Sequence, residues 1–142
     1  MNILKDIVLG ELTFDMWWSR EYKITIFGRK YLVPLIVQTF DDDVISNNQR
    51  EAFLEFKKNK NSIISSMEMA MLAYYKENFS PDANSTEDLS TLVELLKIKI
   101  LSSDDMRELG FIFDASFDPE LGVGVLISNE RVVEVGVQDI VL

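Results

Sequence analysis

The sequence predicts an α+β fold in a single domain that spans residues 1–142. Segments with alternating apolar residues lie towards both ends of the chain, and segments with helical periodicity lie between them, without strand–helix–strand repeats. The length of 142 residues and an apolar content of 47% are typical of one domain with a buried core. We therefore expect an N-terminal β-hairpin, two to three central helices, and a C-terminal antiparallel β-meander packed against the helices.

The N-terminal hairpin is predicted over residues 22–40. Apolar and polar residues alternate over residues 22–26, and Gly28 can adopt the positive φ that a tight turn requires. The returning strand contains Pro34, which cannot donate a hydrogen bond, so we expect it at a sheet edge or a bulge. Residues 11–18 are predicted to form a further strand upstream.

Two central helices are predicted from capping signals and apolar stripes. Ser46 and Gln49 have the spacing of a capping box at the start of the first helix, which continues to Phe56 and beyond. Asn61 or Ser62 can cap the second helix. Its apolar stripe, which we expect in the core, consists of Ile64, Met67, Met71, Tyr74 and Tyr75.

A short third helix is predicted over residues 89–96, after a possible cap formed by Ser85 and Asp88. From residue 97 onwards the apolar period falls to two, with short polar links between alternating segments. This pattern predicts the antiparallel meander.

The residue composition excludes several classes of chemistry and gives the chain an uneven charge. There is no histidine or cysteine, which excludes thiol and imidazole catalysis, disulfides and ordinary zinc sites. The net charge is −10, and residues 81–142 hold 13 acidic but only 4 basic side chains. Such a charge repels nucleic acids and attracts cationic proteins. We therefore expect no binding to nucleic acid, although acidity can also serve solubility alone.

The chain has no segment that predicts export or membrane insertion. The N-terminal ten residues lack the long apolar run of a secretory signal. The longest uncharged apolar stretch, residues 31–40, is about half the length of a spanning helix. We expect a cytoplasmic protein without a membrane partner. The sequence leaves the oligomeric state open: strand edges at Pro34 or near the C-terminus could support a dimer, but nothing requires one, which slightly favours a monomer.

Carboxylates in the C-terminal part are the first candidates for a binding site. Asp114, Asp118 and Glu120 lie in one predicted turn and are candidates for partner binding. With a divalent cation these residues, or Asp139, could instead act as a hydrolase, although the spacing in the turn does not fit the twelve-residue calcium loop. Such a sequence also tightens turns without any function. Asp104 and Asp105 are further partner-binding candidates.

Two other segments are candidates for partner contacts. Asp41, Asp42 and Asp43 form an acidic run that is either a solvated loop or a contact for basic side chains. Trp17 and Trp18 are adjacent, so in an extended strand they face opposite sides and at most one enters the core. The other would be an exposed interface anchor. We predict no catalytic residues, no metal ligands and no cofactor.

Several short motifs together resemble an uncharacterised family of small acidic bacterial α+β domains. Members are encoded beside polymorphic or contact-dependent toxin genes and are suspected immunity proteins. The chain departs from the family pattern at Phe117 and Leu121, where the family has Trp and His, so a potential metal-binding or catalytic histidine is missing. The motifs that carry the resemblance are Ile26–Tyr31, Gln49, Ala73–Tyr75, Phe117–Gly122 and Val135–Asp139.

The resemblance implies a protein that binds a cognate toxin domain, for example a basic nuclease, and blocks its active site. The charge distribution agrees with such a partner. Two alternatives remain open at this point: the cation-dependent hydrolase, and a non-catalytic adaptor domain unrelated to toxins.

Overall fold

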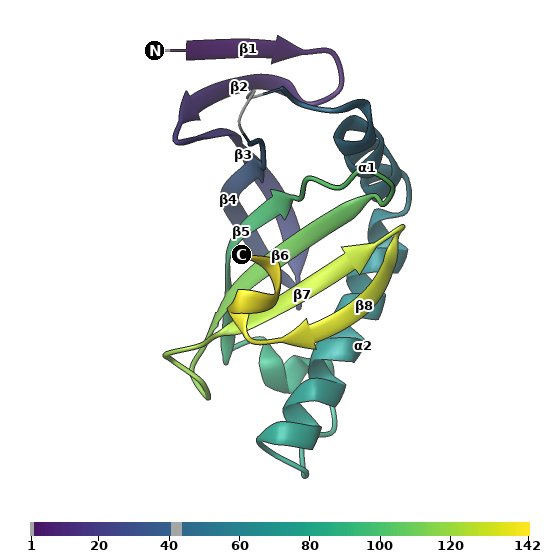
Figure 1. Ribbon diagram of the computed structural model, residues 1–142. Coiled ribbons are helices and arrows are strands. Elements are labelled where there is room, and N and C mark those ends of the chain that lie inside the picture. Colours follow the sequence, from purple (N-terminus) through teal and green to yellow (C-terminus); the bar gives the residue numbers. More distant parts are fainter. Residues whose placement is uncertain (1, 41–43) are drawn as a thin grey trace.

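The computed structural model describes residues 2–40 and 44–142 of the chain (Figure 1). Within these residues, eight strands form one sheet in which the strands follow each other in chain order. Two α-helices and two short 3₁₀ helices, η1 and η2, complete the described structure. The elements are β1 Asn2–Asp6, β2 Gly10–Asp15, β3 Trp17–Ile26, β4 Arg29–Val37, α1 Asn47–Lys58, α2 Lys60–Asn78, η1 Thr86–Leu89, β5 Val93–Ile100, β6 Glu108–Ala115, β7 Val123–Ser128, β8 Arg131–Gly136 and η2 Gln138–Val141.

The predicted fold class is wrong. The N-terminal hairpin and the C-terminal meander are not separate parts, because β4 pairs with β5 in parallel and joins them into one sheet. All other neighbouring strands pair antiparallel. The result is a strand-dominated fold built on one mixed eight-stranded sheet, and the described part of the β4–β5 connection contains two α-helices.

The predicted third helix is also wrong. Ser85 and Asp88 do form a capping box, but it caps η1, which ends at Leu89, and residues 93–96 belong to β5. The leucines and Glu94 favour a helix locally, yet β5 pairs with β4 on one edge and with β6 on the other. Pairing and burial of this interior strand outweigh the weak local preference.

Other local predictions are confirmed or corrected by the pairing of the strands. The β3–β4 turn contains Phe27 and Gly28 at φ of 54° and 73°, as a two-residue turn requires. The predicted strand at residues 11–18 is divided between β2 and β3. Pro34 lies inside β4, at neither an edge nor a bulge; its nitrogen faces away from β3, and pairing with β5 begins only at Leu35.

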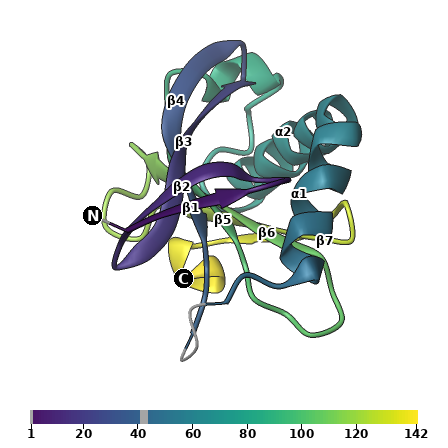
Figure 2. The same ribbon diagram turned by 90° about the horizontal axis from the view of Figure 1, so that it is seen from above.

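The two α-helices cover one face of the sheet (Figures 1 and 2). The capping box predicted at Ser46 and Gln49 is confirmed at the start of α1. Below the helices, the ring of Phe56 in α1 lies 5.8 Å from the ring of Phe111 in β6. Burial of this apolar layer is the main contribution to stability. Its fully buried members include Leu35, Met67, Leu95, Ile98, Ile100, Phe113, Val125 and Ile127.

Among the described residues, η2 covers part of the opposite face of the sheet. The buried side chain of Val141 lies against two glycines, Gly110 in β6 and Gly124 in β7. A Cβ atom on Gly110 would lie 2.7 Å from the Cβ of Val141. The glycines therefore provide the space that lets η2 approach the sheet closely.

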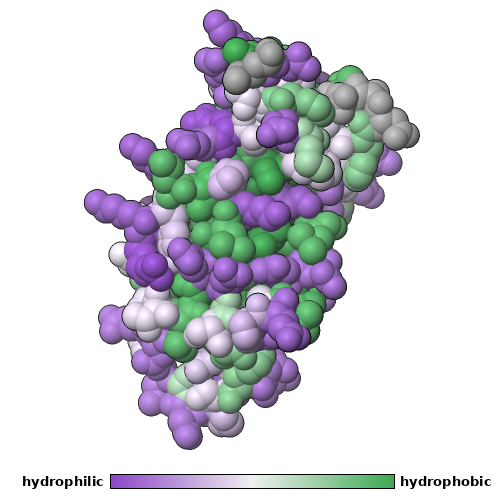
Figure 3. Space-filling model, turned by 90° about the vertical axis from the view of Figure 1, so that its left-hand side faces the viewer, coloured by the Kyte–Doolittle hydropathy of each residue, from purple (hydrophilic) through white to green (hydrophobic). Residues whose placement is uncertain are grey.

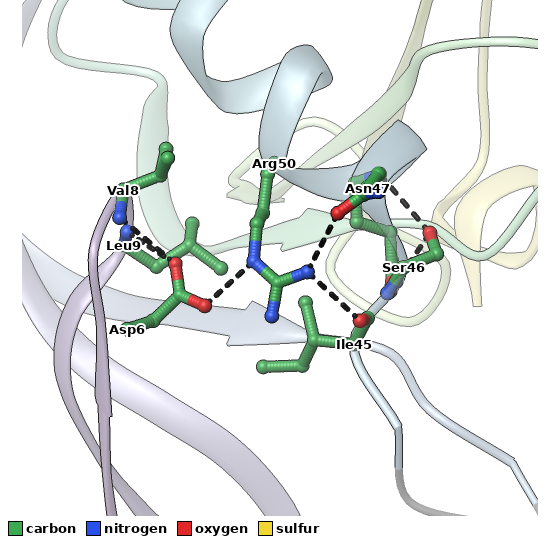
Figure 4. Close-up of polar contacts among 8 residues, drawn as sticks. Asp6, Val8, Leu9, Ile45, Ser46, Asn47 and Arg50 are labelled. Carbon is green, nitrogen blue, oxygen red and sulfur yellow. Dashed lines mark hydrogen bonds and ion pairs between the residues drawn. The ribbon is translucent and has the colours of Figure 1, made fainter.

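The β1–β2 hairpin bends away from β3 and attaches to α1 (Figures 2 and 4). Arg50 Nε donates to Asp6 Oδ1 at 2.6 Å, and Asp6 Oδ2 accepts from the N–H groups of Val8 and Leu9 at 3.0 and 2.9 Å. Burial alone would raise the pKa of Asp6. The hydrogen bonds from Leu9, Arg50 and Val8 outweigh burial, so the pKa is lowered and the ionised form is stabilised.

Candidate functional site

The face of the sheet opposite α1 and α2, here termed the uncovered face, carries exposed apolar side chains. Because side chains alternate along a strand, Trp17 in β3 and Leu32 in β4 point to this face, and Leu96 is the extra residue of a β-bulge in β5, next to Lys97 of this face. They are 39%, 55% and 37% exposed. Figure 3 views the molecule from the side of β3 and β4 and shows apolar side chains gathered between bands of polar ones. An apolar group on an otherwise polar surface marks an interaction site.

Trp17 is fixed across the uncovered face. Its ring centroid lies 5.9 Å from Nζ of Lys99 in β5, two strands away. Lys99 is almost fully buried, and burial, with a smaller effect of Lys97, lowers its pKa. The contact between ammonium and indole offsets part of the cost of burying this charge. Trp17 is therefore a rigid, partly exposed aromatic side chain, which is typical of an interface anchor.

Trp18 lies on the other face, as expected for adjacent residues of one strand. It is half-buried and packs edge-on against Phe14, at 5.1 Å between ring centroids. Trp18 thus belongs to the layer under the helices, and of the two tryptophans only Trp17 points to the uncovered face.

Two carboxylates lie directly opposite each other at the lower end of the uncovered face. Glu94 in β5 and Asp114 in β6 are cross-strand partners, and both side chains are exposed. Among the described residues neither forms an ion pair. Arg29 lines the same depression of about 300 Å³, but its Nη1 donates to the carbonyls of Ser90 and Val93. Like charges at opposed positions repel each other, and the guanidinium of Arg29 in the same depression offsets part of this repulsion; a cationic side chain of a partner would offset more of it.

The remaining acidic candidates lie in two loops at opposite ends of β6. Asp118 and Glu120 lie in the β6–β7 connection, and Asp104 and Asp105 lie in the exposed β5–β6 connection. The eight residues of β6 separate these loops by about 26 Å. The sequence-predicted acidic residues therefore do not form one continuous contact patch. Asp41, Asp42 and Asp43 lie outside the described residues.

An aromatic cluster holds the β6–β7 connection against the end of α2. The ring of Phe117 lies 4.7 Å from the rings of both Tyr75 and Phe79. Burial, together with the charge of Asp118, raises the pKa of neighbouring Tyr74. These ring contacts fix the turn that contains Phe117 against the end of α2.

The carboxylates do not converge on a metal site in the part of the chain that the structure describes. No group of three or more acidic side chains in this part lies close enough to hold an ion. The hydrolase alternative therefore gains no support from the geometry. Within the same residues, no helix has the length and apolar character needed to cross a bilayer.

Sequence reasoning missed Glu94, Leu32, Leu96 and Lys99 as parts of this face. Glu94 and Leu96 were assigned to a helix, which hid their place in a strand. Lys97 and Lys99 alternate with buried isoleucines, and this pattern could have predicted a strand whose lysines point to the uncovered face. The opposition of Glu94 to Asp114 depends on the register of β5 and β6, which no local pattern specifies.

Comparison with protein-family models matches residues 8–142 to the family described as "Domain of unknown function (DUF6985)". The chain belongs to this family. The DUF6985 match contains β2 to η2 and leaves β1, with Asp6, outside. No curated protein and no solved structure matches the chain. The description of the DUF6985 family names no activity, ligand or partner.

Proposed function

We propose that this protein is a cytoplasmic immunity protein that binds a cognate toxin domain of a contact-dependent growth inhibition or similar system and blocks its active site. The observation that carries the proposal is the uncovered face, where the exposed Trp17 and Leu32, with Leu96 at the adjoining bulge, lie near two opposed carboxylates that form no ion pair among the described residues. The toxin domain that fits it is basic, for example a nuclease.

The apolar side chains supply the anchor of this interface. Trp17 is held in place by Lys99, so little conformational entropy is lost when a partner covers it. Leu32 and Leu96 extend the apolar area over β4 and β5. Aromatic side chains at the centre of an interface commonly contribute most of its binding energy.

The carboxylates supply charge complementarity. A lysine or arginine of the toxin that binds between Glu94 and Asp114 relieves the repulsion of this pair, which the free protein retains. The net charge of −10 steers a basic partner towards the protein and makes association faster at low salt. A nuclease holds nucleic acid with lysine and arginine side chains. If the carboxylates of this protein bind those side chains, the nuclease can no longer hold its substrate.

The test is co-purification with the protein encoded by the neighbouring toxin gene, followed by binding measurements at low and high salt. We expect a complex whose affinity falls with salt, and whose toxin is inactive. Trp17→Ala is expected to weaken binding roughly 30-fold, as for an interface hot spot. The matched control is Leu54→Ala, an exposed leucine of α1 on the helical side. Absence of a complex, or equal effects of the two variants, would contradict the proposal.

A further inference from the structure

The outer edge of β3 is open over much of its length. β2 pairs with β3 only at Trp17–Ser19, and within the described residues no other strand lies on this edge from Glu21 to Ile26. The two-residue turn makes Ile26 and Arg29 a hydrogen-bonded pair, so by alternation the main-chain groups of Glu21, Lys23 and Thr25 point outwards. Of these groups, the Glu21 carbonyl accepts from Arg20 Nε at 3.1 Å.

The fold itself keeps this edge open. Arg20 Nη1 donates to the carbonyl of Leu9 at 2.9 Å, and its side chain fills the space beside Gly10, where a Cβ atom would lie 2.9 Å from Nη1. The Asp6–Arg50 ion pair holds the same hairpin on α1. β2 therefore diverges from β3 after three residue pairs and leaves the rest of the edge accessible.

A basic groove follows the open edge, between the β3–β4 hairpin and the start of α2. Its volume is about 590 Å³. Three lysines line it, Lys23, Lys30 and Lys60, and no carboxylate does. Lys60 is fixed, because its Nζ lies 2.9 Å from the hydroxyl of Tyr22 and 4.8 Å from the centre of that ring. In a chain of net charge −10, this concentration of positive charge indicates an anionic occupant.

The groove also has apolar walls, formed by Ile24, Leu32 and Ile64. An occupant that satisfies the main-chain groups of the edge must be an extended peptide, because only a strand presents donors and acceptors at the matching spacing. Lysine in an edge strand discourages pairing with basic or apolar strands, but an acidic strand compensates its charge.

We propose that the outer edge of β3 binds an extended acidic peptide segment of a partner protein as an added strand. The main chain of the peptide pairs with Lys23 and Thr25. Alternate side chains of the peptide are acidic, facing Lys23 and Lys30 on one side of the sheet, and apolar, packing on Ile24 and Ile64 on the other side, where Lys60 borders them. The groove shares Leu32 with the uncovered face, but the strand pairing proposed here uses Lys23 and Thr25 and does not depend on the proposed toxin, so the two proposals fail separately.

The probe is a labelled synthetic heptapeptide, acetyl-Glu-Val-Glu-Val-Asp-Val-Glu-amide, added to the full chain. We expect saturable binding that weakens with salt, and slower amide hydrogen exchange at Lys23 and Thr25 measured by NMR. A peptide of the same sequence with alternate amides N-methylated keeps its charge but cannot pair as a strand. We expect this peptide, and a single-stranded DNA oligonucleotide, to bind at least about ten-fold more weakly.

Two pairs of variants separate the main-chain and charge contributions. Thr25→Pro removes an outward N–H and is expected to weaken binding roughly ten-fold, whereas Thr25→Ala keeps the N–H and stays within about two-fold. Lys23→Glu is expected to weaken binding similarly, and the exposed Lys58→Glu on α1 is its charge-matched control. If Thr25→Pro does not fold, the N-methylated peptide still tests the main-chain pairing and Lys23→Glu still tests the charge contribution. Equal binding of the methylated peptide or of DNA, or no protection at Lys23 and Thr25, overturns the proposal.

Discussion

The two faces of the sheet are made from the same eight strands, yet they differ in what covers them. Phe111 and Val125 point towards the helices and are fully buried, whereas Leu32, on the uncovered face, is 55% exposed. The covered face gains stability from burial, and the uncovered face retains apolar area and unpaired charge that a partner can use. The comparison separates residues that hold the fold from residues that are available for binding.

The largest effect is expected when one side chain from each face is removed and the free energy of unfolding is measured in urea. Phe111→Ala should lower the free energy of unfolding by about 3–5 kcal/mol, because it leaves a cavity under Phe56. Leu32→Ala should change it by about 0.5 kcal/mol or less. Equal losses would mean that the uncovered face is as well packed as the covered one.

The next effect concerns the ion pair between β1–β2 and α1. Asp6→Asn should lower the free energy of unfolding by about 2–3 kcal/mol at pH 7, below the range for fully buried pairs because Arg50 is 28% exposed. The pKa of Asp6 is lowered in the folded state, so its stabilising effect is complete above the pKa of the unfolded chain and is lost as pH falls through the folded pKa.

The measurement is urea unfolding of both proteins at pH 7 and pH 3. We expect the difference between wild type and Asp6→Asn to shrink at the lower pH. Glu130→Gln, which breaks the more exposed pair with Arg107, should have a smaller effect and serves as the control. A difference that grows on acidification would refute this role of Asp6.

A smaller effect is expected where η2 covers the sheet. Gly110→Ala places a methyl group against Val141 and should cost about 1–3 kcal/mol through overpacking. Hydrogen exchange should become faster at residues 138–141, which would show that η2 has detached. Gly136→Ala, where the nearest atom is the Ile140 Cγ2 at 3.3 Å, should be milder. Unchanged exchange in Gly110→Ala would show that η2 does not depend on this contact.

The smallest effect has the opposite sign. Glu94→Gln removes the repulsion with Asp114 and should raise the free energy of unfolding by about 0.2–1 kcal/mol at low salt. The gain should be smaller at about 1 M NaCl, because a Debye length of roughly 3 Å screens the two charges. Glu134→Gln is the control, since Glu134 lies opposite Leu126. A loss of stability in Glu94→Gln would mean that the carboxylate is compensated within the chain.

Local signals were enough for elements whose neighbours in sequence are also their neighbours in space. The turn at Gly28 and the caps at Ser46 and Ser85 follow from side-chain chemistry within a few residues, and the structure confirms them. The opposite directions of Trp17 and Trp18 follow equally from the alternation of a strand. The sequence therefore pointed to the pair, and the structure decided that Trp17 is the exposed member.

Long-range pairing was not accessible in the same way. β5 looked helical because Leu92, Val93 and Leu96 fit a helical spacing, and its strand character depends on β4 and β6. The same pairing makes Glu94 a neighbour of Asp114 and separates Asp104 from Asp118 by the length of β6. Charge counted along the sequence could not show this distribution.

The sequence by itself determined the composition-based exclusions, the acidic charge, the turns, the caps and the alternation of faces, because these depend on residue type and local spacing. Only the tertiary structure decided that the strands form one sheet, that helices cover one face, and that β3 keeps an open edge. These features depend on which distant segments pair, and pairing is set by burial summed over the whole chain, which no short window of sequence contains.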